Sequence, residues 1–283
     1  MNKALRTMIS LPSIFLLAIC LTLPAKAHAK DKITWYVTDW APFNITRGKL
    51  KRKGINDKLI KYIHKFLPDY DLAWKNMNPA LLERAFSKGE NVCQLDLFKT
   101  ERREKIAYFT KNPSIIDAPL RLFVKGKDEK KLNLSFPVKL DQLLNNGNFR
   151  AAFVISRSYN TMIDNVLLNN TNTKITTNES TKRLIKDFFK GKNDYVVEYS
   201  AVMSYFKSTL KYKRDLFSLP IKNTDPFVLG YAACSKTLWG KTTVDAIDAV
   251  LKAHRNDKRY HNILEEWHDE RSKQVIVRNY GSF

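Results

Sequence analysis

Segments that predict strands alternate with segments that predict helices along the first hundred residues. Runs of β-branched and aromatic residues predict the strands, and apolar residues spaced three and four apart predict amphipathic helices. Pro68 and Gly89 mark the ends of the two helices. The predicted elements are a strand over 33–37, a helix over 56–66, a strand over 71–74, a helix over 79–86 and a strand over 92–98.

A second series of alternating elements follows a charged connector around Gly126, where the change in composition indicates a boundary. Strands are predicted over 120–124, 149–155, 195–197, 216–219 and 228–234, and helices over 180–189, 201–210, 244–254 and 260–267. Alternation of this kind predicts an α/β fold with mainly parallel sheets.

The first residues have the pattern of a secretory signal peptide. Lys3 and Arg6 precede an apolar stretch over 9–23, and the small residues Ala27 and Ala29 suit signal peptidase. The apolar stretch is shorter than the roughly 20 residues needed to cross a bilayer. We therefore expect cleavage after Ala29 and a periplasmic protein, with a retained membrane anchor as the alternative.

The chain is strongly basic. Its net charge is +21, and the first 29 residues contribute three of these charges and no acid, so the remainder carries +18. Export removes nucleic acid as a partner and leaves anionic polymers, lipid headgroups or acidic small molecules. The alternative is that the basic clusters at 47–53, 125–131 and 211–214 are solvated surface loops.

Two cysteines, Cys93 and Cys234, remain after cleavage. An oxidising compartment permits one disulfide, two separate thiols are the alternative, and neither cysteine has ligand spacing for zinc. His261, Glu265 and His268 lie at i, i+4 and i+7 and would share one helical face. A solvated face is the commoner interpretation of that pattern, and we predict no metal site.

Local signatures of enzymes are missing from the sequence. It contains no Gly-rich phosphate loop, no GxSxG elbow and no HExxH, and it has nine glycines in all. A site of scattered acids and bases would leave no local pattern. We predict a protein that is not an enzyme and that uses no cofactor.

The strand over 92–98 runs into Thr100-Glu101-Arg102-Arg103, and Phe109-Thr110 follows. With the strand and turn over 35–44 and the turn over 54–57, this pattern resembles the family 3 extracellular solute-binding proteins, the periplasmic component of polar amino-acid uptake systems. The resemblance covers nearly the whole mature chain. It implies a two-lobed, periplasmic-binding-protein-like (type II) α/β fold with a ligand cleft between lobes joined by two crossovers, near 121–124 and 226–230.

The same resemblance implies the division of the chain. Lobe 1 comprises 30–122 and 229–283, and lobe 2 comprises 123–228. Both cysteines then fall in lobe 1, and we predict a bridge between Cys93 and Cys234.

In lobe 1 the resemblance assigns ligand binding to Thr100 and Arg103. A guanidinium matches a carboxylate with two parallel donors, and a hydroxyl completes the shell of the anion. The alternative is that Arg103 forms a surface ion pair with a neighbouring glutamate, and Arg102 competes for either role. Trp40 and Phe43, beside Asp39, match positions at which the family places the aromatic walls of the ligand cleft. The alternative is that both are ordinary core residues.

In lobe 2 the sequence departs from the family pattern at two places. Arg157 stands where a glycine is expected before Ser158, which adds a cation near the ligand's anionic end. Tyr199 stands where an aspartate normally binds the ligand's ammonium group, and Glu198 precedes it, facing the ligand or pointing away. We include all four residues in the predicted ligand site.

These observations predict capture of a small anionic or zwitterionic solute, one that bears a carboxylate such as an amino acid, by a monomer that serves an inner-membrane ABC permease or receptor. Two alternatives use the same fold. The protein could report a ligand to a membrane partner or dock on envelope polymers, or it could be a dehydratase-like enzyme with Glu198 as its acid or base.

Overall fold

The computed structural model describes residues 30–128, 136–155 and 157–282. The predicted signal peptide lies outside these residues. From Asp31 onward the chain forms one compact unit.

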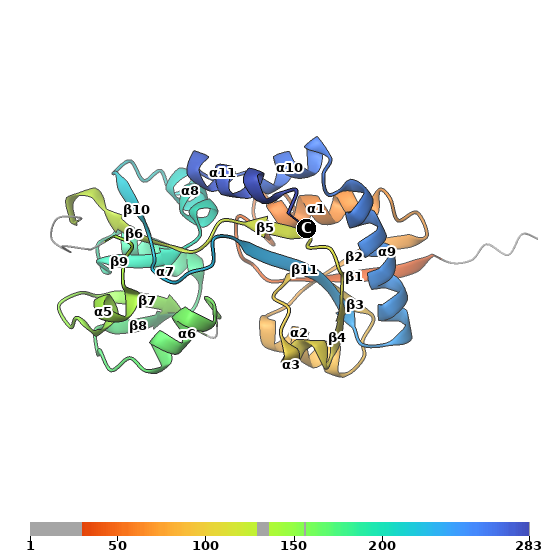
Figure 1. The fold of residues 1–283 in the computed structure, drawn as a ribbon, viewed down its shortest axis with the longest axis horizontal. Helices are drawn as coiled ribbons and strands as arrows, with labels where there is room; N and C mark the ends of the chain where they lie inside the picture. Colours follow the sequence, from red (N-terminus) through yellow and green to blue (C-terminus); the bar gives the residue numbers. More distant parts are fainter. Residues whose placement is uncertain (1–29, 129–135, 156, 283) are drawn as a thin grey trace, which may run out of the picture. The chain divides into compact units, whose positions relative to one another are not determined.

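Lobe 1 is built on a central sheet that the two ends of the chain share (Figure 1). Its strands lie in the order β2-β1-β3-β11-β4, in which β1, β2 and β3 are parallel and β11 runs antiparallel to β3 and β4. The strands are β1 (Asp31–Val37), β2 (Tyr70–Asn76), β3 (Val92–Leu97), β4 (Ala107–Phe109) and β11 (Val228–Ser235). The helices are α1 (Ile55–His64), α2 (Pro79–Ser87), α3 (Glu101–Glu104) and α9 (Leu238–His254). The predicted alternation of strands and helices in this lobe is confirmed.

Lobe 2 contains two smaller sheets, β10-β6-β9, which is entirely antiparallel, and the parallel pair β7-β8. The strands are β6 (Arg121–Lys125), β7 (Ala151–Val154), β8 (Ile175–Asn178), β9 (Tyr195–Glu198) and β10 (Leu216–Pro220). The helices are η1 (Gly126–Asp128), α5 (Leu140–Asn145), α6 (Thr161–Leu168), α7 (Thr181–Phe189) and α8 (Ser200–Thr209). The prediction of mainly parallel sheets is wrong for β10-β6-β9, because β6 enters the lobe against the direction of both its neighbours.

Two strands that pair with one another connect the lobes. β5 (Ile115–Asp117) lies antiparallel to the first residues of β11, with Ile115 opposite Gly230. A Cβ at Gly230 would lie 2.2 Å from the Asp96 Oδ1 atom. Glycine at this place therefore lets a β3 carboxylate approach the backbone of the crossover.

The chain ends in α10 (Lys258–Leu264) and α11 (Glu270–Asn279). The sequence predicts a helix over 260–267, but α10 ends at Leu264, so His268 does not share a helical face with His261. The His261 ring instead stacks on Tyr280, whose hydroxyl donates to Glu265 at 2.9 Å. The sequence pattern does not reveal α11, because α11 is largely polar and has few buried side chains.

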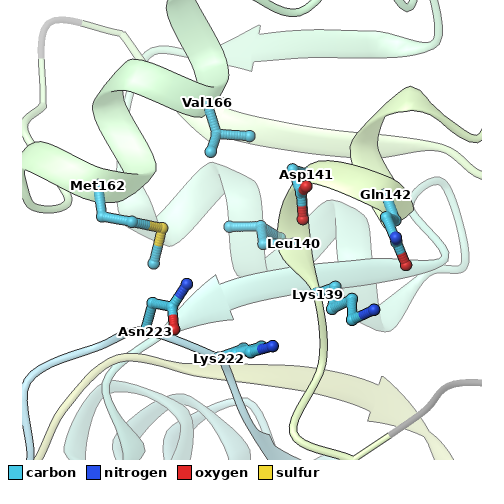
Figure 2. Close-up of a pocket in the computed structure, with 8 residues that line it drawn as sticks. All are labelled: Lys139, Leu140, Asp141, Gln142, Met162, Val166, Lys222 and Asn223. Carbon is cyan, nitrogen blue, oxygen red and sulfur yellow. The ribbon is translucent and has the colours of Figure 1, made fainter.

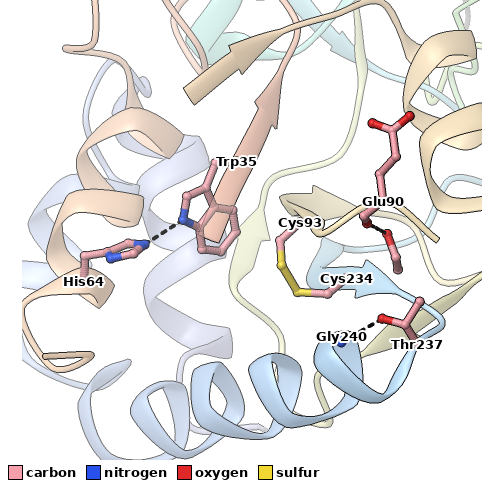
Figure 3. The surroundings of a disulfide bond; sticks show 8 residues. Trp35, His64, Glu90, Cys93, Cys234, Thr237 and Gly240 are labelled. Atoms are coloured by element: carbon pink, nitrogen blue, oxygen red, sulfur yellow. Dashed lines mark hydrogen bonds between the residues drawn. A yellow bond between two sulfur atoms is a disulfide. The ribbon is translucent and has the colours of Figure 1, made fainter. Parts of the chain in front are cut away.

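The predicted disulfide is confirmed. Cys93 on β3 and Cys234 on β11 face one another across the two antiparallel strands, with a Cα–Cα distance of 4.1 Å, and both are fully buried (Figure 3). Nearby, the buried indole of Trp35 donates to the Nε2 atom of His64 at 2.8 Å. Burial lowers the pKa of His64 to about 4, so the ring accepts this bond in its neutral form.

One basic cluster is not a solvated loop throughout. Lys125 in the segment 125–131 is buried at the end of β6, where its Nζ atom donates to the Asn193 carbonyl at 2.7 Å and lies 3.2 Å from an Asp128 oxygen. This lysine therefore satisfies groups inside lobe 2 and does not contribute a free surface charge.

Candidate functional site

The turn after β1 presents two aromatic side chains. Trp40 and Asn44 exchange two backbone hydrogen bonds of 3.0 and 2.9 Å, which close the turn, and the Trp40 and Phe43 rings lie 4.4 Å apart. Phe43 is buried and Trp40 is partly exposed. Asp39 supports the turn, because its carboxylate accepts from the Thr46 amide at 3.2 Å.

Tyr199, at the start of α8, extends from lobe 2 to these aromatic residues. Its ring lies 6.0 Å from that of Phe43 and 5.9 Å from that of Trp40, edge to face in both pairs. Burial, followed by the nearby Asp117 carboxylate, raises the pKa of the Tyr199 hydroxyl, which therefore stays protonated. The structure thus brings the predicted residues Trp40, Phe43 and Tyr199 together.

Arg157 and Glu198 form a buried ion pair beside this aromatic cluster. The Nη1 and Nη2 atoms of Arg157 both donate to the carboxylate of Glu198, whose side chain is fully buried, and the bond from Nη2 is 3.1 Å long. The guanidinium carbon lies 5.3 Å from the Trp40 ring and 4.4 Å from the Tyr159 ring. Burial alone would lower the pKa of Arg157, but the Glu198 carboxylate raises it above its ordinary value, so the guanidinium stays charged.

Arg103 is also occupied by groups of the protein. Its Nε atom lies 3.4 Å from a Glu83 oxygen, and its Nη1 atom donates to the Phe98 carbonyl at 3.0 Å. Arg102 forms a two-pronged ion pair with the same Glu83. The ion pair weighed as an alternative for Arg103 is therefore present, with a glutamate of α2 that is distant in sequence.

Thr100 and Ser158 make local contacts. The Thr100 hydroxyl accepts from the Arg103 amide at 3.4 Å and so caps α3. The Ser158 hydroxyl donates to Asp164 at 2.6 Å, and both Thr100 and Ser158 are exposed. None of these contacts brings Thr100 or Ser158 to the aromatic cluster of Trp40, Phe43 and Tyr199.

The sequence interpretation missed a polar cluster next to Tyr199. Asp96 on β3 is half-buried, and its carboxylate accepts from the Asn56 amide at 3.2 Å. Burial, together with the charge of Asp117, raises the pKa of Asp96 to about 6. The sequence does carry a signal for this cluster. Gln94 and Asp96 are alternate residues of a strand whose other residues are buried and apolar, so both polar side chains lie on the same face of the sheet.

Asp117 is held by a residue from the C-terminal segment. The Nε2 atom of buried His268 lies 2.7 Å from an Asp117 oxygen. Burial alone would lower the pKa of the His268 imidazole, but the Asp117 carboxylate raises it above its ordinary value. Among residues 30–128, 136–155 and 157–282, no group of three or more His, Cys, Asp and Glu side chains could hold a metal ion.

No family model matches the chain, and no curated protein matches it. Solved structures do match. An ancestral cationic amino-acid solute-binding protein superposes with a TM-score of 0.63 at 17% identity, over 85% of this chain and 96% of that chain. A mutant of the arginine-binding protein from T. maritima gives 0.62 at 18%, over 86% and 96%. The chain has the two-lobed periplasmic-binding-protein fold.

The match extends beyond transport proteins. A histidine kinase sensor domain with similarity to periplasmic binding proteins superposes with a TM-score of 0.63 at 15% identity, over 84% of this chain and 95% of that chain. The predicted fold, with a cleft between its lobes, is thereby confirmed. The contacts of Trp40 and Phe43 with Tyr199, and of Trp40 with Arg157, join the turn after β1 to the start of α8 and the segment after β7.

A separate pocket lies within lobe 2 of this binding-protein fold (Figure 2). It has a volume of about 410 Å³, and the start of α5, α6 and the segment after β10 form its walls. Its lining residues are Lys139, Leu140, Asp141, Gln142, Met162, Val166, Lys222 and Asn223. None of the predicted site residues lines it, so this pocket is distinct from the predicted ligand site.

Proposed function

We propose that the protein captures a small amino-acid-like solute outside the cytoplasm, as a monomer, and delivers it to an ABC importer of the inner membrane. The observation that carries this proposal is the contact of Trp40 and Phe43 with Tyr199, and of Trp40 with Arg157, beside the half-buried Asp96. Side chains from both lobes can then contact one solute. The ligands named for the similar structures, arginine and cationic amino acids, support this solute class.

Contact with both lobes is what couples binding to a conformational signal. A ligand shifts an equilibrium between open and closed lobes only as far as it binds the closed form more tightly. The aromatic rings supply apolar area and edge-to-face contacts on both sides of the cleft. An importer that recognises the closed form would then receive loaded protein in preference to empty protein.

The proposed location is the periplasm. Of the helices in the described part of the chain, none has both the length and the apolar character required of a membrane span. The confirmed disulfide fits an oxidising compartment.

The test is a thermal-shift and calorimetric screen of residues 30–283 with amino acids, amines and carboxylic acids. A solute at 100 times its dissociation constant adds about 2.7 kcal/mol of stability, which is readily measured. We expect Trp40→Ala and Tyr199→Ala to abolish the shift. Leu168→Ala, at an 82% exposed position on α6, is the matched control and retains it. If no solute of any class shifts the transition, the proposal is overturned.

Sensing is a second candidate, favoured by the match to the kinase sensor domain. In a strain lacking the protein, loss of uptake of the bound solute supports transport. Unchanged uptake together with a lost transcriptional response supports sensing. An enzymatic role for Glu198 has less support, because Arg157 already occupies both of its carboxylate oxygens.

A further inference from the structure

The carboxylate of Asp96 lies where three parts of the molecule meet. Its own strand is β3, Asn56 of α1 donates to it, and Gly230 of the crossover strand β11 leaves room for it. The backbone amide of Asn56 also donates to the Phe43 carbonyl at 2.9 Å, and the Phe43 ring lies 6.0 Å from that of Tyr199 at the start of α8. Asp96 is therefore at the junction of the lobes and, being half-buried, within reach of a solute.

The groups around Asp96 are hydrogen-bond acceptors that lack donors. Asn56 is 2% exposed, and because its Nδ2 atom donates to Asp96, its buried Oδ1 atom is left as an acceptor. That oxygen has no hydrogen-bond partner, nor has the Oε1 atom of Gln94, whose Nε2 atom donates to the Asp96 carbonyl at 3.3 Å. Buried polar atoms are nearly always paired, so an unpaired acceptor beside a carboxylate indicates a donor that comes from outside the chain.

The other charged residues assigned to this site, and Asp117 beside them, have partners of opposite charge. Arg157 is paired with Glu198, Arg103 with Glu83, and Asp117 with His268. Asp96 has no cationic partner among the residues that the structure describes. Arg103 and Arg157, the two arginines assigned to the ligand site, are thus occupied by acids of the protein, whereas an acid is left for a positively charged solute.

We propose that the captured solute carries a protonated amine or a guanidinium group, which Asp96 and the Asn56 Oδ1 atom bind. This proposal rests on the proposed solute-binding function and assigns its charge class. The ammonium donors fill the unpaired acceptors, and the charge neutralises the carboxylate. The rings of Phe43 and Tyr199 lie beside the site and add an attraction between cation and aromatic face.

The net charge of the mature chain does not oppose this assignment at short range. The surface charges that make up the +18 are screened over about 8 Å at physiological ionic strength. A hydrogen-bonded carboxylate within 3 to 4 Å of an ammonium group interacts with much less screening, because it is partly removed from water. The basic surface therefore slows the approach of a cation more than it weakens the bound complex.

The electrostatics of Asp96 support the proposal independently of the contacts. Burial and the neighbouring Asp117 raise its pKa to about 6, so at neutral pH the folded protein holds a carboxylate in an unfavourable environment. A cation bound beside it would reverse that effect.

The experiment uses residues 30–283 and three probes with the same four-carbon chain. They are 1,4-diaminobutane, 1,4-butanediol and succinate, with L-arginine as the amino-acid counterpart of the diamine. Calorimetry at pH 7.5 is expected to show binding of the diamine or of arginine, and no binding of the diol or of succinate. Asp96→Asn, which keeps the shape of the side chain, should weaken binding of the cation by roughly tenfold to a hundredfold, the range for a charged hydrogen bond.

Two further variants make the result interpretable. Gly230→Ala, which displaces the Asp96 carboxylate without changing any charge, should also weaken binding of the cation. Asp245→Asn, on the exposed face of α9, removes one negative charge elsewhere and should leave the affinity unchanged. Circular dichroism and a melting curve establish that each variant is folded.

The outcomes separate the two proposals. Binding of succinate but of no amine, or an unchanged affinity in folded Asp96→Asn, overturns the assignment of charge class and leaves solute capture standing. If no probe and no solute of the wider screen binds the wild-type protein, solute capture is overturned and the assignment falls with it.

Discussion

Replacing Asp96 by asparagine is expected to stabilise the protein at neutral pH. The pKa of Asp96 is about 6 in the folded protein and 3.8 in its ordinary state. Each pKa unit corresponds to 1.36 kcal/mol, so the two-unit difference corresponds to an upper limit of about 3 kcal/mol. The asparagine still accepts from Asn56 but carries no charge that burial could disfavour.

The sign follows from which state binds the proton. Between pH 4 and pH 6 the folded protein keeps Asp96 protonated while the unfolded chain has released that proton. The free energy of unfolding of the wild type therefore loses this contribution as the pH rises through that window. His64 has the opposite effect in nearly the same window, because its folded pKa is lowered to about 4. The two contributions oppose one another, so the pH dependence of the wild-type free energy of unfolding does not by itself reveal the effect of Asp96 or of His64.

The assay is urea unfolding of both proteins at half-unit steps from pH 4 to pH 8. The quantity to follow is the free energy of unfolding of Asp96→Asn minus that of the wild type, in which His64 and all other groups cancel. We expect this difference to rise by about 2 to 3 kcal/mol between pH 4 and pH 8 and to level off above pH 7. Asp245→Asn should give a flat difference. A flat or falling difference for Asp96→Asn would refute the reasoning that burial raises the pKa of this carboxyl.

Three other substitutions test the remaining parts of the argument. Glu198→Gln should lower the free energy of unfolding by about 3–5 kcal/mol in urea titrations, because it leaves Arg157 buried without its acid, and a loss below 1 kcal/mol would contradict the buried pair. Replacing both Cys93 and Cys234 by alanine should cost up to about 5 kcal/mol, given that 141 residues separate them, as measured by urea unfolding without reductant. His64→Gln should remove the loss of up to about 3 kcal/mol that His64 contributes as the pH falls from 6.5 to 4, measured as the difference in free energy of unfolding between variant and wild type, and a difference that does not change with pH would count against the lowered pKa of this imidazole.

Much of the fold could be predicted from the sequence because periodicity reports burial directly. The strand at β1 and the helices at α1 and α7 each carry enough apolar residues to define their type. The elements that were missed or misjudged are short or polar. α11 is an example, because its mean hydropathy is low and the packing of a few side chains orders it.

The candidate site was only partly accessible to the same reasoning. Trp40 and Phe43 were found because they follow a buried strand in a turn, and Tyr199 because it stands out against a family pattern. The sequence does not show which charged side chains are paired with one another in the folded protein. Arg103 and Arg157 look like free cations in the sequence, and Glu83 and Glu198, which neutralise them, are 20 and 41 residues away.

The sequence by itself predicted much of the succession of strands and helices, and its resemblance to a known family implied the two-lobed class of fold and the pairing of the two cysteines. Only the tertiary structure decided which charges are balanced, because an ion pair depends on distances between residues that are remote in the chain. Asp96 shows the difference most clearly. Its position on the polar side of β3 is a local pattern, but its isolation from any described cation, and so the charge of the solute that it would bind, is a property of the folded molecule.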